Sequence, residues 1–480
     1  MRWFTSLMAG SGRDSSCIRS ASPSSRRGQE GNMPRFTPML MPAPTNGTTW
    51  CLRTASTSSL GKFMVPLLGR TIARSGRFSF PVFGRAFLPW GTLVLEQCPG
   101  YTLAVRGAPR MSLSPQAPSP RVATPSVWAP WGLTVAMLVH HFGLWAWTSS
   151  SRGIPLLQML DRWDSNLYSR LVTEGYTWPL WAFLPLYPGT VWLLRQGLGG
   201  TLPPQLVGCL LSTPCLLAFV AWNTRWSRQG RLVGALTAGT GWGWFLLLYS
   251  PASFTLHSHH TEGLFLLLSF GALAFAARGA LLSSAVLVAL CVWTRNQGVF
   301  VAITAALLLA GREPSWRSRA LRFAALGALA LLAFGGLLAF EWARAGDPFM
   351  FMKAQREWNH VDSVWGAVRG LWLGNPWHKG FNGWLLLRHA FGALWLAAAL
   401  ALLRRDRALG LYALLSLLVM LPQGDLGNAF RFGAVLFPVL FLAGDWLATR
   451  PAWVRWTVAV LCVWLNHKVT HAYAIGRWAY

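Results

Sequence analysis

Apolar runs separated by short polar turns fill the chain from residue 128 almost to its end. A helix needs about 20 mostly apolar residues to cross the hydrocarbon core of a bilayer, where unpaired backbone groups are not tolerated. On this basis we predict an all-α, polytopic bundle of eleven membrane-spanning helices. They cover residues 128–148, 203–222, 232–249, 263–277, 280–293, 298–311, 320–343, 385–403, 408–422, 431–448 and 453–467, of which the fourth and fifth are short.

Basic residues in the short connections predict the orientation of these helices. Arginines occur on alternate turns, at 225–231, 278, 312–322, 404–407 and 450–455, and short connections rich in Lys and Arg remain in the cytoplasm. The scheme requires that residues 181–195 do not cross the membrane. We expect an interfacial helix there, with Trp181 and Trp192 at headgroup level.

Acidic residues fall mainly on the opposite side. Of the twelve Asp and Glu after Met111, nine lie on the predicted extracytoplasmic face, at 161, 164, 174, 262, 341, 347, 357, 362 and 425. That face also carries the two long loops, 149–202 and 344–384, and connections of this length are usually functional or disordered. We therefore expect the chemistry to take place outside the cytoplasm.

Composition supports a membrane protein. The chain has 480 residues, of which 53% are apolar and only 12% are charged, with a net charge of +27. In a soluble protein such a charge would suggest nucleic-acid binding, but here the basic residues punctuate apolar runs, so no nucleic-acid partner is expected. The seven Cys form no CxxC pair and predict neither a zinc site nor a disulfide framework.

Residues 1–110 are different from the rest. They hold 14 of the 42 basic residues and three acids, with no helical or strand period. We interpret them as an unstructured extension from a misplaced start, with initiation near Met111; a disordered tail or a transit peptide are the alternatives. Residues 111–480 then form the membrane domain.

Two carboxylates follow the first predicted span. Asp161 and Asp164 in the segment LDRWDSNLYSRLVTEGY are three residues apart and share a face if the segment is helical. A carboxylate at the membrane surface can accept a proton from a sugar hydroxyl, which is the role of a general base. The alternative for Asp161 is capping at the start of a short surface helix.

A histidine-rich segment, SPASFTLHSHHTEG, brings His257, His259, His260 and Glu262 to the same predicted face. These residues could ligate zinc, but the spacing is not that of a known zinc motif, and we favour polar residues that line a substrate site. His140 and His141, within the first span, are expected only to hydrogen-bond to neighbouring helices.

Two arginines lie at the same predicted level, Arg295 in TRNQG and Arg431 in GNAFRF. A guanidinium group binds phosphate through two parallel hydrogen bonds. The alternative is a flanking residue whose charge rests among the headgroups. The loop GDPFMFMKAQREWNHVDS supplies Lys353, His360 and Asp362 and is either an amphipathic helix covering the site or a plain connector.

The ordered set WDSNLYSRLVTEGY, AFLPLYP, SPASFTLHSHHTEGLFLLL, TRNQG and GDPFMFMKAQREW resembles the PIG-V-type mannosyltransferases and their bacterial relatives over residues 128–448. The resemblance implies a GT-C fold and transfer of mannose, with inversion, from a polyprenyl-phosphate donor to an extracytoplasmic glycolipid, glycan or protein acceptor. It also implies a multi-pass protein of the bacterial inner membrane or the endoplasmic reticulum.

The resemblance also implies site residues. The family's Trp-Asp pair corresponds to Trp163 and Asp164, its aromatic-Pro-Leu-Tyr-Pro stretch to residues 183–188, and its Thr-Arg pair to Thr294 and Arg295. His260 replaces the family's Tyr before Thr261 and Glu262, which leaves the acceptor or the sugar open. We assign catalysis to Asp164 and Asp161, donor phosphate binding to Arg295 and Arg431, and substrate binding to Trp163, Tyr187, His260 and Glu262.

No cofactor is expected, and a monophosphate donor needs no metal. A transporter or lipid flippase is the main rival, but such proteins usually place ionisable residues near the bilayer midplane and show repeated halves, which this sequence lacks. A structural assembly protein would not need so many acids on one face. Within enzymes, a GT-C transferase for another sugar remains an alternative.

Overall fold

The computed structural model describes residues 128–232, 234–357, 383–418, 426 and 428–477. All regular secondary structure in these ranges is helical, which confirms the predicted all-α class for this part of the chain. The predicted extension over residues 1–110 lies outside the described residues.

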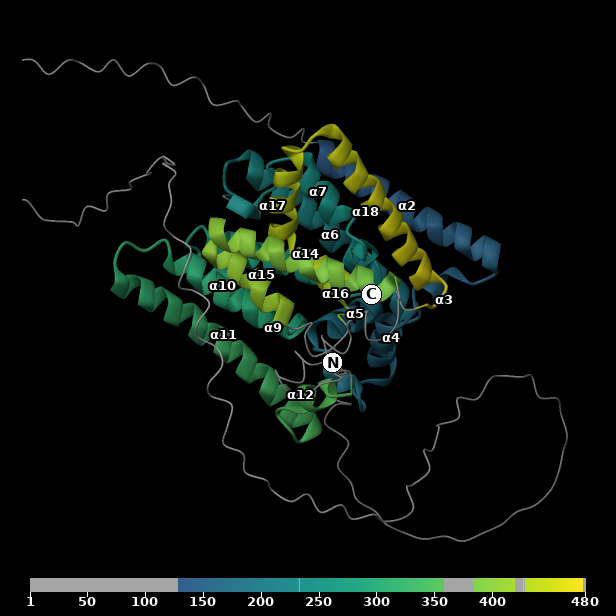
Figure 1. The fold of residues 1–480 in the computed structure, drawn as a ribbon. Coiled ribbons are helices and arrows are strands. Elements are labelled where there is room, and N and C mark those ends of the chain that lie inside the picture. The colour runs from purple at the N-terminus through teal and green to yellow at the C-terminus, as the bar shows by residue number, and fades with distance from the viewer. Residues whose placement is uncertain (1–127, 233, 358–382, 419–425, 427, 478–480) are drawn as a thin grey trace, which may run out of the picture. The chain divides into compact units, whose positions relative to one another are not determined.

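The helices follow one another along the chain as Figure 1 shows. Their bounds are α2 (Trp128–Arg152), α3 (Leu156–Met159), α4 (Asp164–Glu174), η1 (Leu180–Ala182), α5 (Leu186–Gly197), α6 (Pro204–Arg228), η2 (Gly234–Leu236), α7 (Gly241–Leu248), η3 (Ser253–Leu256), α8 (Glu262–Ala276), α9 (Leu281–Thr294), α10 (Gly298–Ala310), α11 (Trp316–Ala345), α12 (Met350–Gln355), α14 (Gly383–Arg405), α15 (Arg407–Leu418), α16 (Ala429–Gly433), α17 (Phe437–Ala448) and α18 (Ala452–Ala474).

Three of these helices are long and apolar enough to cross a membrane: α6, α11 and the Leu386–Arg405 part of α14. The other predicted spans coincide with helices too, but two are broken. Of residues 232–249 only η2 and α7 are helical, and residues 431–448 are divided between α16 and α17. Pro438 at the start of α17 explains the second break, because its ring has no N–H to continue the preceding turn.

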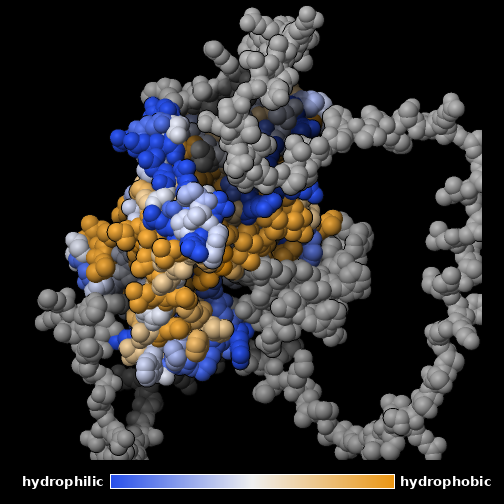
Figure 2. All heavy atoms as spheres, turned by 90° about the vertical axis from the view of Figure 1, so that its left-hand side faces the viewer, coloured by the Kyte–Doolittle hydropathy of each residue, from blue (hydrophilic) through white to orange (hydrophobic). Residues whose placement is uncertain are grey.

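The core of the bundle is built around α8. Most of its side chains are buried, and it packs against α6, α9 and α10. A helix that is apolar on all sides belongs in such a position. By contrast, α11 presents Leu321, Leu331 and Leu332 to the outside, each more than 70% exposed. Figure 2 shows the side on which α11 lies in Figure 1, with hydrophobic residues gathered across the middle and hydrophilic residues above and below. This arrangement fits a helix that faces lipid.

The first long loop is largely helical. It contains α3, α4, η1 and α5, and both α4 and α5 pack against α6. The predicted interfacial helix over residues 181–195 is therefore not continuous, since η1 ends at Ala182 and α5 begins at Leu186. The second loop begins with α12, which packs on η1, where the Gln355 side chain donates to the Ala182 carbonyl at 2.8 Å. Within the described part of this segment, which the sequence leaves open between a cover helix and a plain connector, the helix α12 has six residues, and His360 and Asp362 lie outside the described residues.

Candidate active site

Four charged side chains from distant parts of the sequence meet beside α8. We call Asp164, Glu262, Arg295 and Arg431 the charge cluster. Arg431 donates through Nε to Glu262 and through Nη1 to Asp164, and Arg295 Nη1 donates to the same Glu262 oxygen, Oε1, at 2.5 Å. Two carboxylates and two guanidinium groups thus form one connected set with no net formal charge.

The cluster opens to the surroundings through only one of its members. The side chain of Asp164 is 22% exposed, whereas Arg295 is 8% exposed, Arg431 is 4% exposed and Glu262 is fully buried. A substrate approaching from outside would therefore meet the Asp164 carboxylate first.

Asp164 is placed by the start of a helix. It is the first residue of α4, where a negative charge interacts favourably with the helix dipole. The preceding residue, Trp163, has φ 49° and ψ −123°, a backbone conformation that residues other than Gly rarely adopt. Its indole N–H donates to the Arg477 carbonyl at 3.1 Å. Local strain of this kind persists where surrounding contacts enforce it and is common at functional sites.

Glu262 is ionised in spite of its burial. It begins α8, directly after Thr261. Burial by itself would raise the pKa of this carboxyl, but the adjacent Arg295 and Arg431 lower the pKa to about 2. The carboxylate therefore acts as the fixed negative charge that holds both arginines.

Arg295 lies in the tight turn between α9 and α10. Gly298 makes this turn possible, because a Cβ there would lie 2.3 Å from the Cys291 carbonyl oxygen. The guanidinium group of Arg295 donates to Thr261 Oγ1 at 2.6 Å and, through Nε, to Gln297 Oε1 at 3.3 Å. It also lies over the Phe432 ring at 5.2 Å from the centroid.

The interior location of the arginines contradicts the snorkelling alternative. Arg295 and Arg431 are both buried and paired with carboxylates, instead of extending from a helix end toward headgroups. Thr294, the other half of the Thr-Arg pair, does not join them: its hydroxyl donates to the Leu290 carbonyl within α9 at 2.6 Å.

Asp161 makes different contacts. Its carboxylate accepts from the side chains of Asn166, at 3.0 Å, and Ser169, at 2.5 Å, both on α4. Asp161 therefore braces α4 from outside the helix. It does not cap the helix through backbone N–H groups as the alternative reading expects, and it makes no contact with the charge cluster among the described residues.

The three histidines of the 250–263 segment point to different partners. His257 pairs with His141 at 2.8 Å, His259 with the Tyr187 hydroxyl at 3.0 Å, and His260 with the Ser258 hydroxyl at 2.8 Å. No three His, Cys, Asp or Glu side chains in the described ranges are arranged to hold a metal ion. Burial lowers the pKa of each of these histidines, so the rings are neutral at physiological pH.

The predicted substrate residues divide into surface and interior positions. Trp163 is 38% exposed and adjoins Asp164, as expected of a residue that meets a sugar. Tyr187 and His260 are fully buried. Gly208 of α6 allows the Tyr187 partner His259 to pack closely, since a Cβ at that glycine would lie 1.7 Å from the ring. In this structure, Tyr187 and His260 are therefore interior residues whose partners are other buried side chains.

Several residues near the site were not singled out from the sequence. Gln297 and Phe432 contact Arg295, and Tyr473 of α18 hydrogen-bonds to Ser165, the neighbour of Asp164, at 2.7 Å. Gln297 lies within TRNQG and Phe432 ends GNAFRF, so both belong to the motifs that carry the arginines, and the sequence offered a signal for them. Tyr473 lies beyond the last predicted span and carried none.

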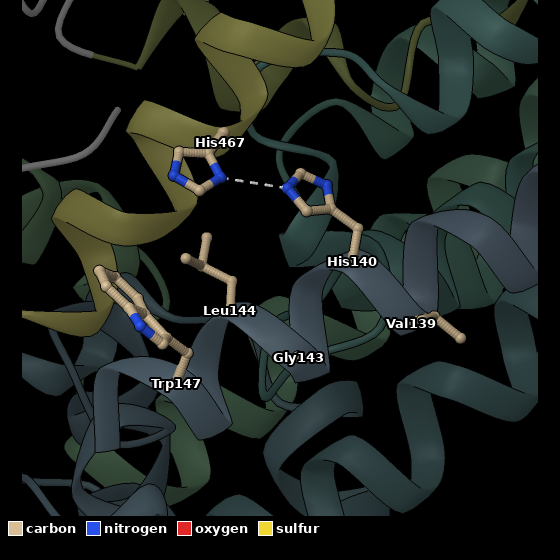
Figure 3. Close-up of a pocket in the computed structure, with 6 residues that line it drawn as sticks. All are labelled: Val139, His140, Gly143, Leu144, Trp147 and His467. Carbon is tan, nitrogen blue, oxygen red and sulfur yellow. Dashed lines mark hydrogen bonds between the residues drawn. The ribbon is translucent and has the colours of Figure 1, made fainter. Parts of the chain in front are cut away.

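A separate cavity of about 410 Å³ lies between α2 and α18 (Figure 3). His140 and His467 face each other across it, with Nε2 and Nδ1 3.2 Å apart. The remaining lining residues are Val139, Gly143, Leu144 and Trp147. The cavity shares no lining residue with the charge cluster. His141 bonds to Asn466 of α18 at 2.7 Å, which confirms the predicted helix-to-helix role of His140 and His141.

The described part of the chain is thus helical and holds a buried set of arginines and carboxylates that reaches the surroundings through one aspartate. Residues 151–310, about a third of the chain, match the family model described as Mannosyltransferase (PIG-V). The match confirms the resemblance to PIG-V-type mannosyltransferases and identifies the protein as a membrane glycosyltransferase. No curated protein and no solved structure matches the chain.

The matched segment contains three members of the charge cluster. Asp164, Glu262 and Arg295 lie within it, whereas Arg431 lies 121 positions beyond its end at residue 310. The structure therefore adds to the matched segment an arginine that bonds to two of its carboxylates.

Proposed function

We propose that this protein transfers mannose from a polyprenyl-phosphate donor to an acceptor hydroxyl outside the cytoplasm, with inversion at the anomeric carbon. The observation that carries the proposal is the shared Glu262 oxygen, which holds Arg295 and Arg431 together beside the exposed Asp164 carboxylate. Cations and a carboxylate thus lie at one place. Glycosyl transfer requires both, because the leaving phosphate needs positive charge and the attacking hydroxyl needs a base.

The arginines serve the leaving phosphate. Nη2 of Arg295 makes no hydrogen bond within the described residues. The other donors of this side chain are occupied, since Nε donates to Gln297 and Nη1 donates to Thr261 and Glu262. When the sugar–phosphate bond breaks, the polyprenyl phosphate gains a second negative charge. Fixed cations in a buried site stabilise developing charge strongly, since they need no reorganisation at that moment.

Asp164 serves the acceptor. In the structure its carboxylate accepts a hydrogen bond from Arg431, which occupies one of its oxygens. A donor phosphate that engages Arg431 would draw the guanidinium group away and leave Asp164 available. The carboxylate then takes the proton of the acceptor hydroxyl while the hydroxyl oxygen attacks the anomeric carbon from the side opposite the phosphate. Donor binding thereby activates the base, so the donor binds first.

The membrane orientation in this proposal is the one predicted from the sequence. Eleven crossings with the arginine-rich connections in the cytoplasm bring Asp164, Glu262, Arg295 and Arg431 to the extracytoplasmic side. Glycosyl transfer at that face would use a donor lipid that is already translocated.

The test compares two neighbouring aspartates. Membranes containing the wild type, Asp164→Asn or Asp161→Asn would be incubated with a panel of polyprenyl-phosphate sugars and a lipid extract, and the sugar consumed would be identified. We expect consumption of the mannosyl donor, and a loss of about 100-fold or more for Asp164→Asn, the usual contribution of a general base. Asp161→Asn, which removes only a brace of α4, should keep most of the activity.

Two outcomes would contradict the proposal. If Asp164→Asn transfers mannose at the wild-type rate, Asp164 is not the base. If another sugar is consumed in place of mannose, the site belongs to a transferase of the same class with a different donor.

A further inference from the structure

The turn between α9 and α10 buries a glutamine next to the predicted phosphate-binding arginine. Gln297 is 1% exposed and occupies the position directly before α10. A polar residue at that position commonly folds back to accept from the first backbone N–H groups of the helix. The Gln297 side chain does not do so. Its amide is therefore available for other partners.

The orientation of this amide is fixed by Arg295. The Nε of Arg295 donates to the amide at 3.3 Å. Because a guanidinium N–H can only donate, the oxygen Oε1 must face it, and the NH₂ group of Gln297 must point elsewhere. Nε2 is buried and has no hydrogen-bond partner among the described residues. Buried donors are nearly always satisfied, so an orphaned one indicates a missing partner.

The missing partner must be a hydrogen-bond acceptor, because an amide NH₂ cannot accept. It lies beside a guanidinium group and near the N-terminus of the thirteen-residue helix α10, where anions are favoured. An anionic oxygen satisfies all three conditions. Helices α9 and α10 pack against each other (Figure 1). Gln297 lies in the turn between the end of α9 at Thr294 and the start of α10 at Gly298.

We propose that Gln297 is a further ligand of the donor phosphate, with Nε2–H donating to a phosphate oxygen that Arg295 also binds. This inference rests on the proposed function and specifies one more contact of that site. The amide plays two parts: its oxygen holds Arg295 in place and its nitrogen binds the ligand.

Two substitutions separate ligand binding from a purely positioning role. Gln297→Glu keeps an acceptor for Arg295 Nε but removes the N–H donor and adds a negative charge facing the phosphate. Gln297→Met has a similar shape and removes both functions. If the residue only positioned Arg295, Gln297→Glu, which keeps the acceptor for Nε, would be less impaired than Gln297→Met, which removes it. Under our proposal both are impaired, and Gln297→Glu more severely.

The measurement is binding of undecaprenyl phosphate to the purified full-length protein in lipid nanodiscs, with undecaprenol as the ligand that lacks phosphate. We expect Kd for undecaprenyl phosphate to rise about 10-fold for Gln297→Met and more for Gln297→Glu, as for loss of a hydrogen bond to a charged group. Undecaprenol binding should be equal in all variants. Gln229→Glu adds the same charge at the exposed end of α6 and should bind like the wild type.

The results distinguish this inference from the proposed function. Wild-type affinity in Gln297→Glu would overturn it, and so would the same loss of affinity for undecaprenol as for undecaprenyl phosphate. Wild-type protein that binds undecaprenyl phosphate but transfers no mannose would overturn only the proposed reaction. Thermal unfolding of each variant shows whether a loss reflects misfolding. If the charged variant is unstable, wild-type affinity in the neutral Gln297→Met would overturn the inference.

Discussion

The molecule contains two buried polar regions of opposite character. The charge cluster joins two carboxylates and two guanidinium groups, whereas the histidine cluster, made of His140, His141, His257, His467 and Asn466, joins neutral rings between α2, α18 and the segment before α8. The first opens outward through Asp164. The second ties helices to one another. A buried group that is neutral can be satisfied by one hydrogen bond, whereas a buried charge needs an opposite charge, so only the first region is prepared for an ionic ligand.

The largest effect should follow the removal of the shared carboxylate. Glu262→Gln leaves Arg295 buried without a carboxylate partner and leaves Arg431 with Asp164 alone. Breaking a buried ion pair from one side typically destabilises by about 3–5 kcal/mol. We expect a marked fall of the unfolding temperature in detergent and loss of transfer. Glu174→Gln, which breaks the exposed pair with Arg170, is the matched control and should unfold like the wild type.

If Glu262→Gln is as stable as Glu174→Gln, the ion pairs of Glu262 do not stabilise the fold. The charge cluster would then not differ from the histidine cluster in its need for paired charges.

The next effect concerns the shape of the cation. Arg295→Lys keeps the charge but loses the fork that reaches Gln297, Thr261 and Glu262 together. We expect the KM for the polyprenyl-phosphate donor to rise about 10-fold, because an ammonium group cannot keep these three partners and also donate to the phosphate. Steady-state kinetics in membranes would measure it. An unchanged KM would show that only the charge of Arg295 matters. Arg312→Lys, on an exposed arginine that bonds to the Ala277 carbonyl, is the control.

A smaller effect is expected in the histidine cluster. His141→Ala removes the bonds to His257 and Asn466. The orphaned buried partners should lower the free energy of unfolding by about 1–3 kcal/mol. The KM for the donor should stay at the wild-type value, since none of these residues contacts the charge cluster. A raised KM with unchanged stability would show that the two regions act as one site.

The smallest effect is a difference in pH dependence. The pKa values of His257, His259 and His260 are lowered by burial below the usual 6.5, so the unfolded chain binds more protons than the folded one once the pH falls below that value. Stability should therefore fall from pH 7 to pH 5. Glu262, whose pKa is about 2, stays ionised in this window, and its contribution is lost only at more acidic pH.

Unfolding temperatures of the wild type and His259→Gln between pH 5 and 8 would measure this difference. We expect a shallower slope in the variant, because one buried neutral ring is removed. Equal slopes would show that His259 titrates alike in the folded and unfolded states.

Sequence alone predicted the positions of the described helices and named the four residues of the charge cluster. Apolar periodicity is local, so each predicted span coincides with a helical segment, although breaks near Thr240 and Pro438 were not foreseen. The motifs also pointed to Asp164, Glu262, Arg295 and Arg431. The sequence assigned catalysis to Asp161 as well as Asp164, however, because spacing along a helix does not say where the helix begins. The structure separates them, since α4 starts at Asp164 and Asp161 lies outside it.

What the chain determined by itself is therefore the apolar helices, the membrane setting and the types of chemical group available. Only the tertiary structure decided which groups meet. Arg431 and Glu262 are 169 positions apart, yet share a hydrogen bond, and three histidines within four positions turn to three different partners. The physical reason is range: helix formation depends on neighbours within a few turns, whereas the pairing of buried charges depends on how distant helices pack.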